Sequence, residues 1–309
     1  MTAPARARLD LALIARHPGL SRRKARDVIE KGQVSVDGRV VRAAGTEVDE
    51  RARLDWDPNR RALPRARATL PLLWSDDAVV VVDKPAGLLA VPTERGADED
   101  TALGRVQDYA RHLHPRAPFV GVVHRLDRDT SGALAFALTP AAREGLRALF
   151  RSHRIERRYV ALVEGRPRGE AGEIDVPIHE SYTSGRRRLA REDEEGRRAL
   201  TRWRVLERFK EAALLELTLE TGRQHQIRLH LAHIGMPVLG EPVYAERAPG
   251  RTPGRGRRPP VAARRQLLHA RVLGFAHPLT GAPVRAESPL PEEFRRALTH
   301  LRRAGGSGR

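Results

Sequence analysis

The sequence predicts an α+β fold with two domains. Its 309 residues exceed the length of a typical single domain. Short apolar runs without charge, typical of buried strands, alternate with segments of helical periodicity in both parts of the chain. A stretch rich in proline, arginine and alanine separates these two parts. We therefore predict a small domain over residues 1–58, a linker over 59–72 and a larger domain over 73–309.

The small domain should contain two helices followed by a hairpin. The apolar run 9–14 favours the first helix, and Ser21 is a good N-cap for a second helix that ends at Lys31-Gly32. Within 34–41, valines alternate with polar residues around the turn Asp37-Gly38, which is a strong hairpin signal. This pattern predicts a small α/β domain.

Basic residues gather on the second helix and at its end; they are Arg22, Arg23, Lys24, Arg26 and Lys31. Backbone amides and cationic side chains at a helix start can together bind RNA phosphates, although a solvated basic face has the same composition. The motif order RLD, SRRKA and GQVSVDG resembles that of S4 RNA-binding domains. This resemblance implies that the small domain is S4-like and binds RNA through these five residues.

The larger domain begins with two apolar runs around the turn 75–77, and the second run ends at Lys84-Pro85. Two more strand-like runs, 119–123 and 133–138, enclose the polar segment 124–132, HRLDRDTSG. A salt-bridged turn is the ordinary interpretation of such a segment. A polar loop fixed between core strands can also hold a carboxylate at the floor of a cleft, where burial and arginines set its reactivity.

Further elements of the larger domain follow in order. Helical spacing of apolar residues predicts a helix over 140–151, and a strand is predicted over 157–165. The apolar run 214–219 leads into the block TGRQHQIRLH. Residues 246–264 are rich in Pro, Gly and Arg, which predicts a mobile basic insertion, either on RNA or without specific contacts. Strands around LHA and FAHP and a short helix close the domain.

The composition favours a polyanionic partner. The chain has 57 Lys+Arg against 39 Asp+Glu, a net charge of +18, and nucleic acid is the simplest explanation. It has no cysteine, which excludes disulfides, thiolate metal sites and a cysteine nucleophile, and which fits a reducing compartment. No stretch is apolar enough to span a bilayer or to form a signal core, so we expect a cytoplasmic protein that does not bind membranes.

Three ordered motifs of the larger domain resemble those of the RluA-type pseudouridine synthases. They are VVDKPAGLLAVP, HRLDRDTSG and TGRQHQIRLH. The departures from the family pattern are Asp83, Arg158 and Gln224, which stand where asparagine, lysine and threonine are common. The resemblance implies a mixed, mostly antiparallel sheet flanked by helices, with the active cleft across its centre.

By position in these motifs, the resemblance makes Asp127 the catalytic carboxylate and Arg228 the cation paired with it. Tyr159 would stack on uracil and assist transfer of the C5 proton. The implied substrate pocket is lined by Arg125, Leu268 and His225. Attack at ribose C1′, attack at uracil C6 and a glycal route all fit an ionised aspartate.

The resemblance implies an RNA pseudouridine synthase that uses neither a metal nor another cofactor. Members with an S4 domain commonly act on large-subunit (23S) ribosomal RNA, which is favoured here over transfer RNA. A monomer is the expected state. The alternatives are a non-catalytic RNA-binding protein of ribosome assembly and a hydrolase that removes the base. His225 and His230 have no third ligand at a spacing suited to zinc.

Overall fold

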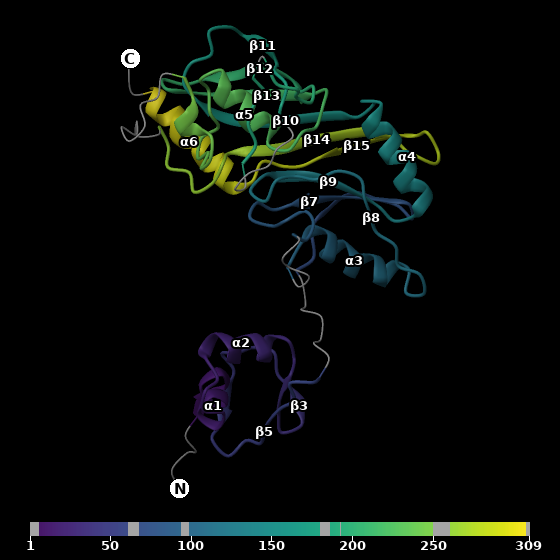
Figure 1. Ribbon diagram of the computed structural model, residues 1–309, viewed down its shortest axis with the longest axis vertical. Coiled ribbons are helices and arrows are strands. Elements are labelled where there is room, and N and C mark those ends of the chain that lie inside the picture. Colours follow the sequence, from purple (N-terminus) through teal and green to yellow (C-terminus); the bar gives the residue numbers. More distant parts are fainter. Residues whose placement is uncertain are drawn as a thin grey trace. The chain divides into compact units, whose positions relative to one another are not determined.

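The computed structural model describes residues 6–60, 68–93, 99–179, 186–191, 193–249 and 260–306. The chain divides into two compact units, residues 1–67 and 68–309, and each is described by itself (Figure 1). Within the predicted linker 59–72, residues 61–67 lie outside the described part, Leu70 is buried in the core of the second unit and Leu72 begins a strand. No helix among the described residues is long and apolar enough to cross a membrane.

The first unit combines two helices with short antiparallel strands. Its elements are β1 (Arg6–Arg8), α1 (Leu9–Arg16), α2 (Arg22–Glu30), β2 (Val34–Val36), β3 (Arg39–Val40), β4 (Glu47–Asp49) and β5 (Leu54–Trp56). The two predicted helices and the β2–β3 hairpin are confirmed. Ser21 caps α2 by accepting the Lys24 amide at 3.2 Å. Leu13, Val28 and Ile29 belong to the core that α1 and α2 share with β2 and β4.

The second unit contains a mixed, mostly antiparallel sheet, as predicted. Its strands are β6 (Leu72–Ser75), β7 (Val79–Lys84), β8 (Gly121–Val122), β9 (Ser131–Ala137), β10 (Glu156–Glu164), β11 (Ala171–Asp175), β12 (Leu200–Arg208), β13 (Ala212–Leu219), β14 (Leu268–Ala276) and β15 (Pro283–Glu287). The order is β11-β12-β13-β10-β14-β9-β7-β6, with β15 beside β14 and β8 beside β9. Among the described strands, only β14 and β9 pair in parallel.

Helices cover both faces of this sheet. They are α3 (Ala102–Leu113), α4 (Pro140–Arg151), α5 (Gln226–His233) and α6 (Glu292–Gly306), with a 3-10 turn η1 (Ala245–Arg247). The alternation of core residues along the strands places α3 and α5 on one face and α4 and α6 on the other. The helix over 140–151 was predicted. The helix α3 was not, because small residues at Ala102, Val106 and Ala110 form its inward face.

The strand predicted over 119–123 is shorter than expected. β8 pairs with β9 only at Gly121–Val122. In this register Val123 would lie opposite Ala135, but the Ala135 amide donates instead to Nε2 of His124 at 2.9 Å. The side chain therefore replaces the next ladder bond, and the chain leaves the sheet there.

β14 lies between β10 and β9 and approaches β9 very closely. At the parallel pair, Ser131 and Gly132 face His269 and Ala270. Gly132 has a φ of +116°, and a Cβ at this position would lie 2.2 Å from the Ala270 carbonyl oxygen. Only glycine fits both the backbone angle and this contact.

Of the predicted basic insertion 246–264, residues 250–259 lie outside the described part.

Candidate active site

The polar loop HRLDRDTSG joins β8 to β9 and is anchored on both sides of Asp127. Before Asp127, the His124 ring stacks on Phe150 with 4.7 Å between centroids, and its Nε2 accepts the Ala135 amide at 2.9 Å. Burial lowers the pKa of His124 to about 3, so the ring is neutral and Nε2 can accept. The loop therefore enters the site in a fixed direction.

After Asp127, the loop is held by Lys84, a fully buried residue at the end of β7. Its Nζ donates to the carbonyl oxygens of Pro85 at 3.0 Å, Leu88 at 2.7 Å and Arg128 at 2.9 Å. Burial lowers the pKa of this ammonium group to about 7, while the charge of Asp127 acts in the opposite direction. Three carbonyl acceptors on one group fix the backbone next to Asp127.

A buried guanidinium links Asp127 to a second carboxylate. Arg228 Nη1 donates to Asp127 Oδ2 at 3.1 Å, whereas Nε and Nη2 donate to the two oxygens of Glu241 at 2.7 and 2.8 Å. The Glu241 side chain is 0% exposed, and its Oε1 also accepts the backbone amides of Val243 at 2.9 Å and Tyr244 at 3.3 Å. Glu241 therefore orients Arg228, and Arg228 presents one N–H to Asp127.

Arg228 remains a cation in this setting. Burial lowers the pKa of its guanidinium, but the hydrogen bonds and charge of Glu241, together with Asp127, outweigh burial and raise the pKa above its ordinary value. Its Cζ also lies 5.3 Å from the centre of the Tyr244 ring. The Asp127 side chain thus has the permanent positive charge of Arg228 beside it, and with 22% of its surface exposed it remains partly accessible to solvent.

The helix α5 carries Arg228 and is buried along nearly its whole length. Gln226 Nε2 donates to Thr201 Oγ1 at 3.1 Å, and the same hydroxyl lies 2.9 Å from His230 Nδ1. The other ring nitrogen of His230 lies 3.0 Å from the Val176 carbonyl oxygen, and burial lowers the pKa of this histidine to about 4. This network fixes the rotation of α5 and hence the direction of Arg228.

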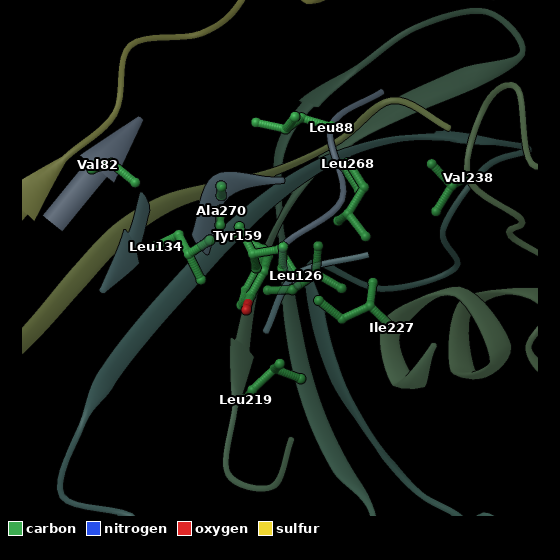
Figure 2. Packing of buried hydrophobic residues seen from close by; sticks show 14 of the residues in the cluster. Val82, Leu88, Leu126, Leu134, Tyr159, Leu219, Ile227, Val238, Leu268 and Ala270 are labelled. Carbon is green, nitrogen blue, oxygen red and sulfur yellow. The ribbon is translucent and has the colours of Figure 1, made fainter. Parts of the chain in front are cut away.

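Tyr159 lies on β10, between Leu217 of β13 and Ala270 of β14. Figure 2 shows its ring among apolar side chains that include Leu126 and Leu268. Burial raises the pKa of the phenol, and the negative charge of Asp127 contributes to the rise. Tyr159 is therefore protonated at neutral pH.

The predicted site residues take different positions around Asp127. Arg228 contacts it directly, and His225 Nε2 lies 3.9 Å from Asp127 Oδ1. Tyr159 and Leu268 belong to the adjoining apolar cluster, whereas Arg125 is exposed on the loop. No group of three or more His, Asp or Glu side chains in the described ranges is placed to hold a metal ion.

A groove of about 1410 Å³ is lined in part by residues of the same loop. It is lined by Lys84, Asp129, Ser131 and Arg265, among others, and by residues of α6. Asp127 is not among the lining residues. The position of the site therefore follows from the contacts of the carboxylate and not from the size of this hollow.

In the first unit, two of the predicted RNA-binding residues surround the fully buried carboxylate of Asp10. Arg22 and Arg26 approach it at 3.4 and 3.0 Å, and Arg8 does so at 3.1 Å. Burial raises the pKa of Asp10, but hydrogen bonds from Arg8 and Arg26 outweigh burial and lower the pKa to about 2. Three half-exposed guanidinium groups thus share one negative charge and leave an excess of positive charge toward solvent.

The other predicted RNA-binding residues lie on the same helix or just after it. Lys24 and Lys31 are 3.7 and 3.0 Å from Asp27 Oδ2, and Arg23 is exposed. These contacts are modest surface pairs, so they hold the side chains only weakly. The basic face is thus partly ordered by Asp10 and partly free to adapt.

Sequence reasoning missed Glu241, Tyr244 and the anchoring role of Lys84. Glu241 and Tyr244 lie in a turn whose composition has no periodic signal. Lys84 was assigned only to a strand end, although a lysine that ends a strand of four buried valines just before a proline could have indicated a buried cation. Asp127 was predicted as the partner of Arg228 from motif position, whereas a second carboxylate on the same guanidinium was not predicted.

Comparisons with known proteins were made for both units. The family model described as RNA pseudouridylate synthase matches residues 78–233, and the model described as S4 domain matches residues 7–54. A protein of Pseudomonas aeruginosa named ribosomal large subunit pseudouridine synthase D is 37% identical over 308 residues, which cover 96% of this chain and 92% of the relative. The two matched models therefore follow one another in the order of the two units.

Two further matches agree with these. An uncharacterized RNA pseudouridine synthase of Bacillus subtilis, YlyB, is 33% identical over 96% of this chain and 95% of its own length. The solved structure of human RNA pseudouridylate synthase domain containing 4 matches with a TM-score of 0.60 and 26% identity, over 75% of this chain and 92% of that one.

Proposed function

This chain belongs to the RNA pseudouridylate synthase family, and we propose that it converts uridine to pseudouridine in large-subunit ribosomal RNA with Asp127 as its catalytic carboxylate. The observation that supports this role is the chain of contacts from Asp127 through Arg228 to Glu241, which keeps a partly exposed carboxylate beside a permanent cation. The names of the relatives support ribosomal RNA as substrate. Transfer RNA is the alternative substrate.

The reaction breaks the bond from ribose C1′ to uracil N1 and forms a bond from C1′ to C5. An ionised carboxylate beside C1′ can act as a nucleophile or assist departure of the base, and Arg228 favours the ionised form. Tyr159 offers a flat ring for stacking on uracil and a protonated hydroxyl near C5. Leu268 and His225 complete the wall of the pocket.

Uridine within folded RNA must leave its stack to reach Asp127, which costs a few kcal/mol. Phosphate contacts elsewhere offset this cost, and the arginines around Asp10 in the S4 unit suit that purpose. Arg125, exposed on the loop, would hold the displaced strand.

Asp127, Arg228 and Glu241 all come from one chain, which supports a monomer as the active form. A ribosomal substrate supports action in the cytoplasm.

The test compares wild-type protein with Asp127→Asn on total RNA that lacks the modification. Carbodiimide-dependent primer extension detects pseudouridine as a stop one nucleotide before the modified base. We expect a stop in large-subunit ribosomal RNA with wild type and none with Asp127→Asn, although both proteins bind RNA. Asp129→Asn, two residues along the same loop, is the matched control and should give the wild-type stop.

Each other outcome contradicts a definite part of the proposal. A full stop with Asp127→Asn would refute the role of this carboxylate. A stop found only in transfer RNA would show that transfer RNA, and not ribosomal RNA, is the substrate. Binding without any stop, for every variant, would favour a non-catalytic role in ribosome assembly, and a change in product mass would indicate base removal, because isomerisation leaves the mass unchanged.

A further inference from the structure

His225 has a backbone conformation that its side chain does not favour. It precedes α5 with a φ of +59° and a ψ of 14°, in the left-handed region. A non-glycine residue in this region costs about 1–2 kcal/mol, and glycine and asparagine adopt it most easily. The side chain of His225 makes no capping hydrogen bond to α5. Neither the backbone conformation of the turn nor capping of the helix therefore explains why this residue is a histidine.

The imidazole is instead directed toward two groups of the active site. Nδ1 lies 2.7 Å from the Tyr244 hydroxyl oxygen, and Nε2 lies 3.9 Å from Asp127 Oδ1. The side chain is 11% exposed. The other oxygen of Asp127, Oδ2, already accepts from Arg228. His225 is therefore the group beside the carboxylate oxygen that Arg228 leaves free.

The partners of Tyr244 determine which nitrogen of His225 carries the proton. The Tyr244 oxygen accepts the backbone amide of Arg187 at 3.0 Å, so its own proton is available to His225 Nδ1. An Nδ1 that accepts leaves the ring proton on Nε2, which faces Asp127. Burial lowers the pKa of His225, while Asp127 and Glu241 raise it and Arg228 and Arg187 lower it, which supports a neutral ring.

We propose that His225, oriented by Tyr244, is a positioning residue for Asp127: its Nε2–H donates to Oδ1 in the RNA-bound enzyme and, with Arg228 on Oδ2, holds the carboxylate in one rotamer. A closure of about 1 Å turns the present 3.9 Å separation into a hydrogen bond, and catalytic contacts commonly tighten in this way when substrate binds. This role rests on the proposed function of Asp127. The backbone strain at His225 is then the cost of directing the imidazole at the reacting carboxylate.

Two substitutions separate positioning from a structural role. His225→Asn provides a residue that adopts the left-handed conformation easily but cannot reach both Tyr244 and Asp127. Tyr244→Phe keeps the ring over Arg228 and removes only the hydroxyl. For both variants we expect kcat to fall about 10- to 100-fold, the size associated with misplacing a catalytic group, while KM for RNA stays within about threefold. The melting temperature of His225→Asn should equal or exceed that of wild type.

Tyr109→Phe, which removes a hydroxyl from α3, is the matched control and should keep wild-type kcat. Nitrogen-15 NMR of histidine-labelled protein should show the Nε2–H form of His225 in wild type and in Tyr109→Phe, and a shift toward the other tautomer in Tyr244→Phe. This readout decides the question even if His225→Asn fails to fold.

Wild-type kcat in both variants, a loss confined to KM, or a loss of activity that parallels a loss of stability would each overturn the positioning role. An unchanged tautomer in Tyr244→Phe would do the same. Asp127→Asn is measured alongside: if it stays active, the proposed catalytic role fails, whereas an inactive Asp127→Asn with fully active His225→Asn and Tyr244→Phe refutes only this inference.

Discussion

Replacing Glu241 by glutamine should lower both stability and activity. Glutamine has the size of glutamate, but four N–H groups point at this carboxylate, two from Arg228 and one each from Val243 and Tyr244. If the amide oxygen keeps the contacts of Oε1, the amide nitrogen takes the place of Oε2, 2.7 Å from Arg228 Nε. Both groups are then hydrogen-bond donors, so they repel each other. The variant loses a charge-assisted hydrogen bond and leaves Arg228 with one carboxylate partner, Asp127.

The expected loss follows from the burial of this pair. Removing one partner of a buried ion pair costs about 3–5 kcal/mol. Because Asp127 still neutralises part of the charge and the amide oxygen keeps one guanidinium contact, we expect the unfolding free energy to fall by about 2–4 kcal/mol. Glu216→Gln is the matched control: its partner Arg204 lies at 2.7 Å but is 57% exposed. That substitution should cost about 1 kcal/mol or less.

Urea unfolding followed by circular dichroism measures the two free energies, and single-turnover pseudouridine formation measures the rate. A displacement of the Arg228 guanidinium by about 1 Å would reduce the rate constant about 100-fold in Glu241→Gln and leave Glu216→Gln unaffected. If the two variants were equally stable and equally active, the inference that Glu241 orients Arg228 would be wrong.

Two other predictions concern the residues that anchor the loop carrying Asp127. Gly132→Ala places a Cβ 2.2 Å from the Ala270 carbonyl oxygen at a φ of +116°, so its unfolding free energy in urea should fall by at least about 3 kcal/mol. Gly281→Ala, at a φ of +75° with open space around it, should lose only about 1 kcal/mol, and equal losses would contradict the close approach of the strands. For Lys84, burial lowers the folded-state pKa from 10.5 to about 7. Between these two pH values the lysine is protonated in the unfolded chain and largely neutral in the folded protein, so the unfolding free energy rises with pH. The unfolding free energy of wild type should therefore rise relative to Lys84→Met by up to about 1.4 kcal/mol per pH unit between pH 7 and 9, and parallel curves would rule this out.

The sequence predicted the place of the loop HRLDRDTSG between two strands because its signals are local. Two uncharged runs around this loop indicate core strands without any knowledge of their partners, and the proposed role of Asp127 rests on the resemblance of the motif. The pairing of Asp127 with Arg228 was inferred only from motif position, since 101 residues separate the two side chains. Glu241 could not be predicted, because nothing in a turn sequence indicates that its carboxylate will be enclosed by a guanidinium and two amides.

The first unit shows the same limit on a smaller scale. The helix α2 and its cap follow from local spacing, and Arg22 and Arg26 are recognisable as basic residues on it. Their arrangement around Asp10 depends on how α1 packs against α2, and this packing brings together residues 12 and 16 positions apart. A basic helix face can therefore be predicted from sequence, whereas the order imposed on it cannot.

The position of β14 also bears on when this enzyme becomes complete during its synthesis. The strands before it form two groups that are each contiguous in sequence, β6 to β9 and β10 to β13, and β14 joins them by inserting between β9 and β10. Asp127 belongs to the first group, and Tyr159 and Arg228 follow in or after the second. Pairing β14 with β9 and β10 joins residues far apart in sequence, so the entropy cost of closing these long loops arises late in folding. A chain still emerging from the ribosome thus contains Asp127, Tyr159 and Arg228 before it contains the strand that brings their two groups of strands together.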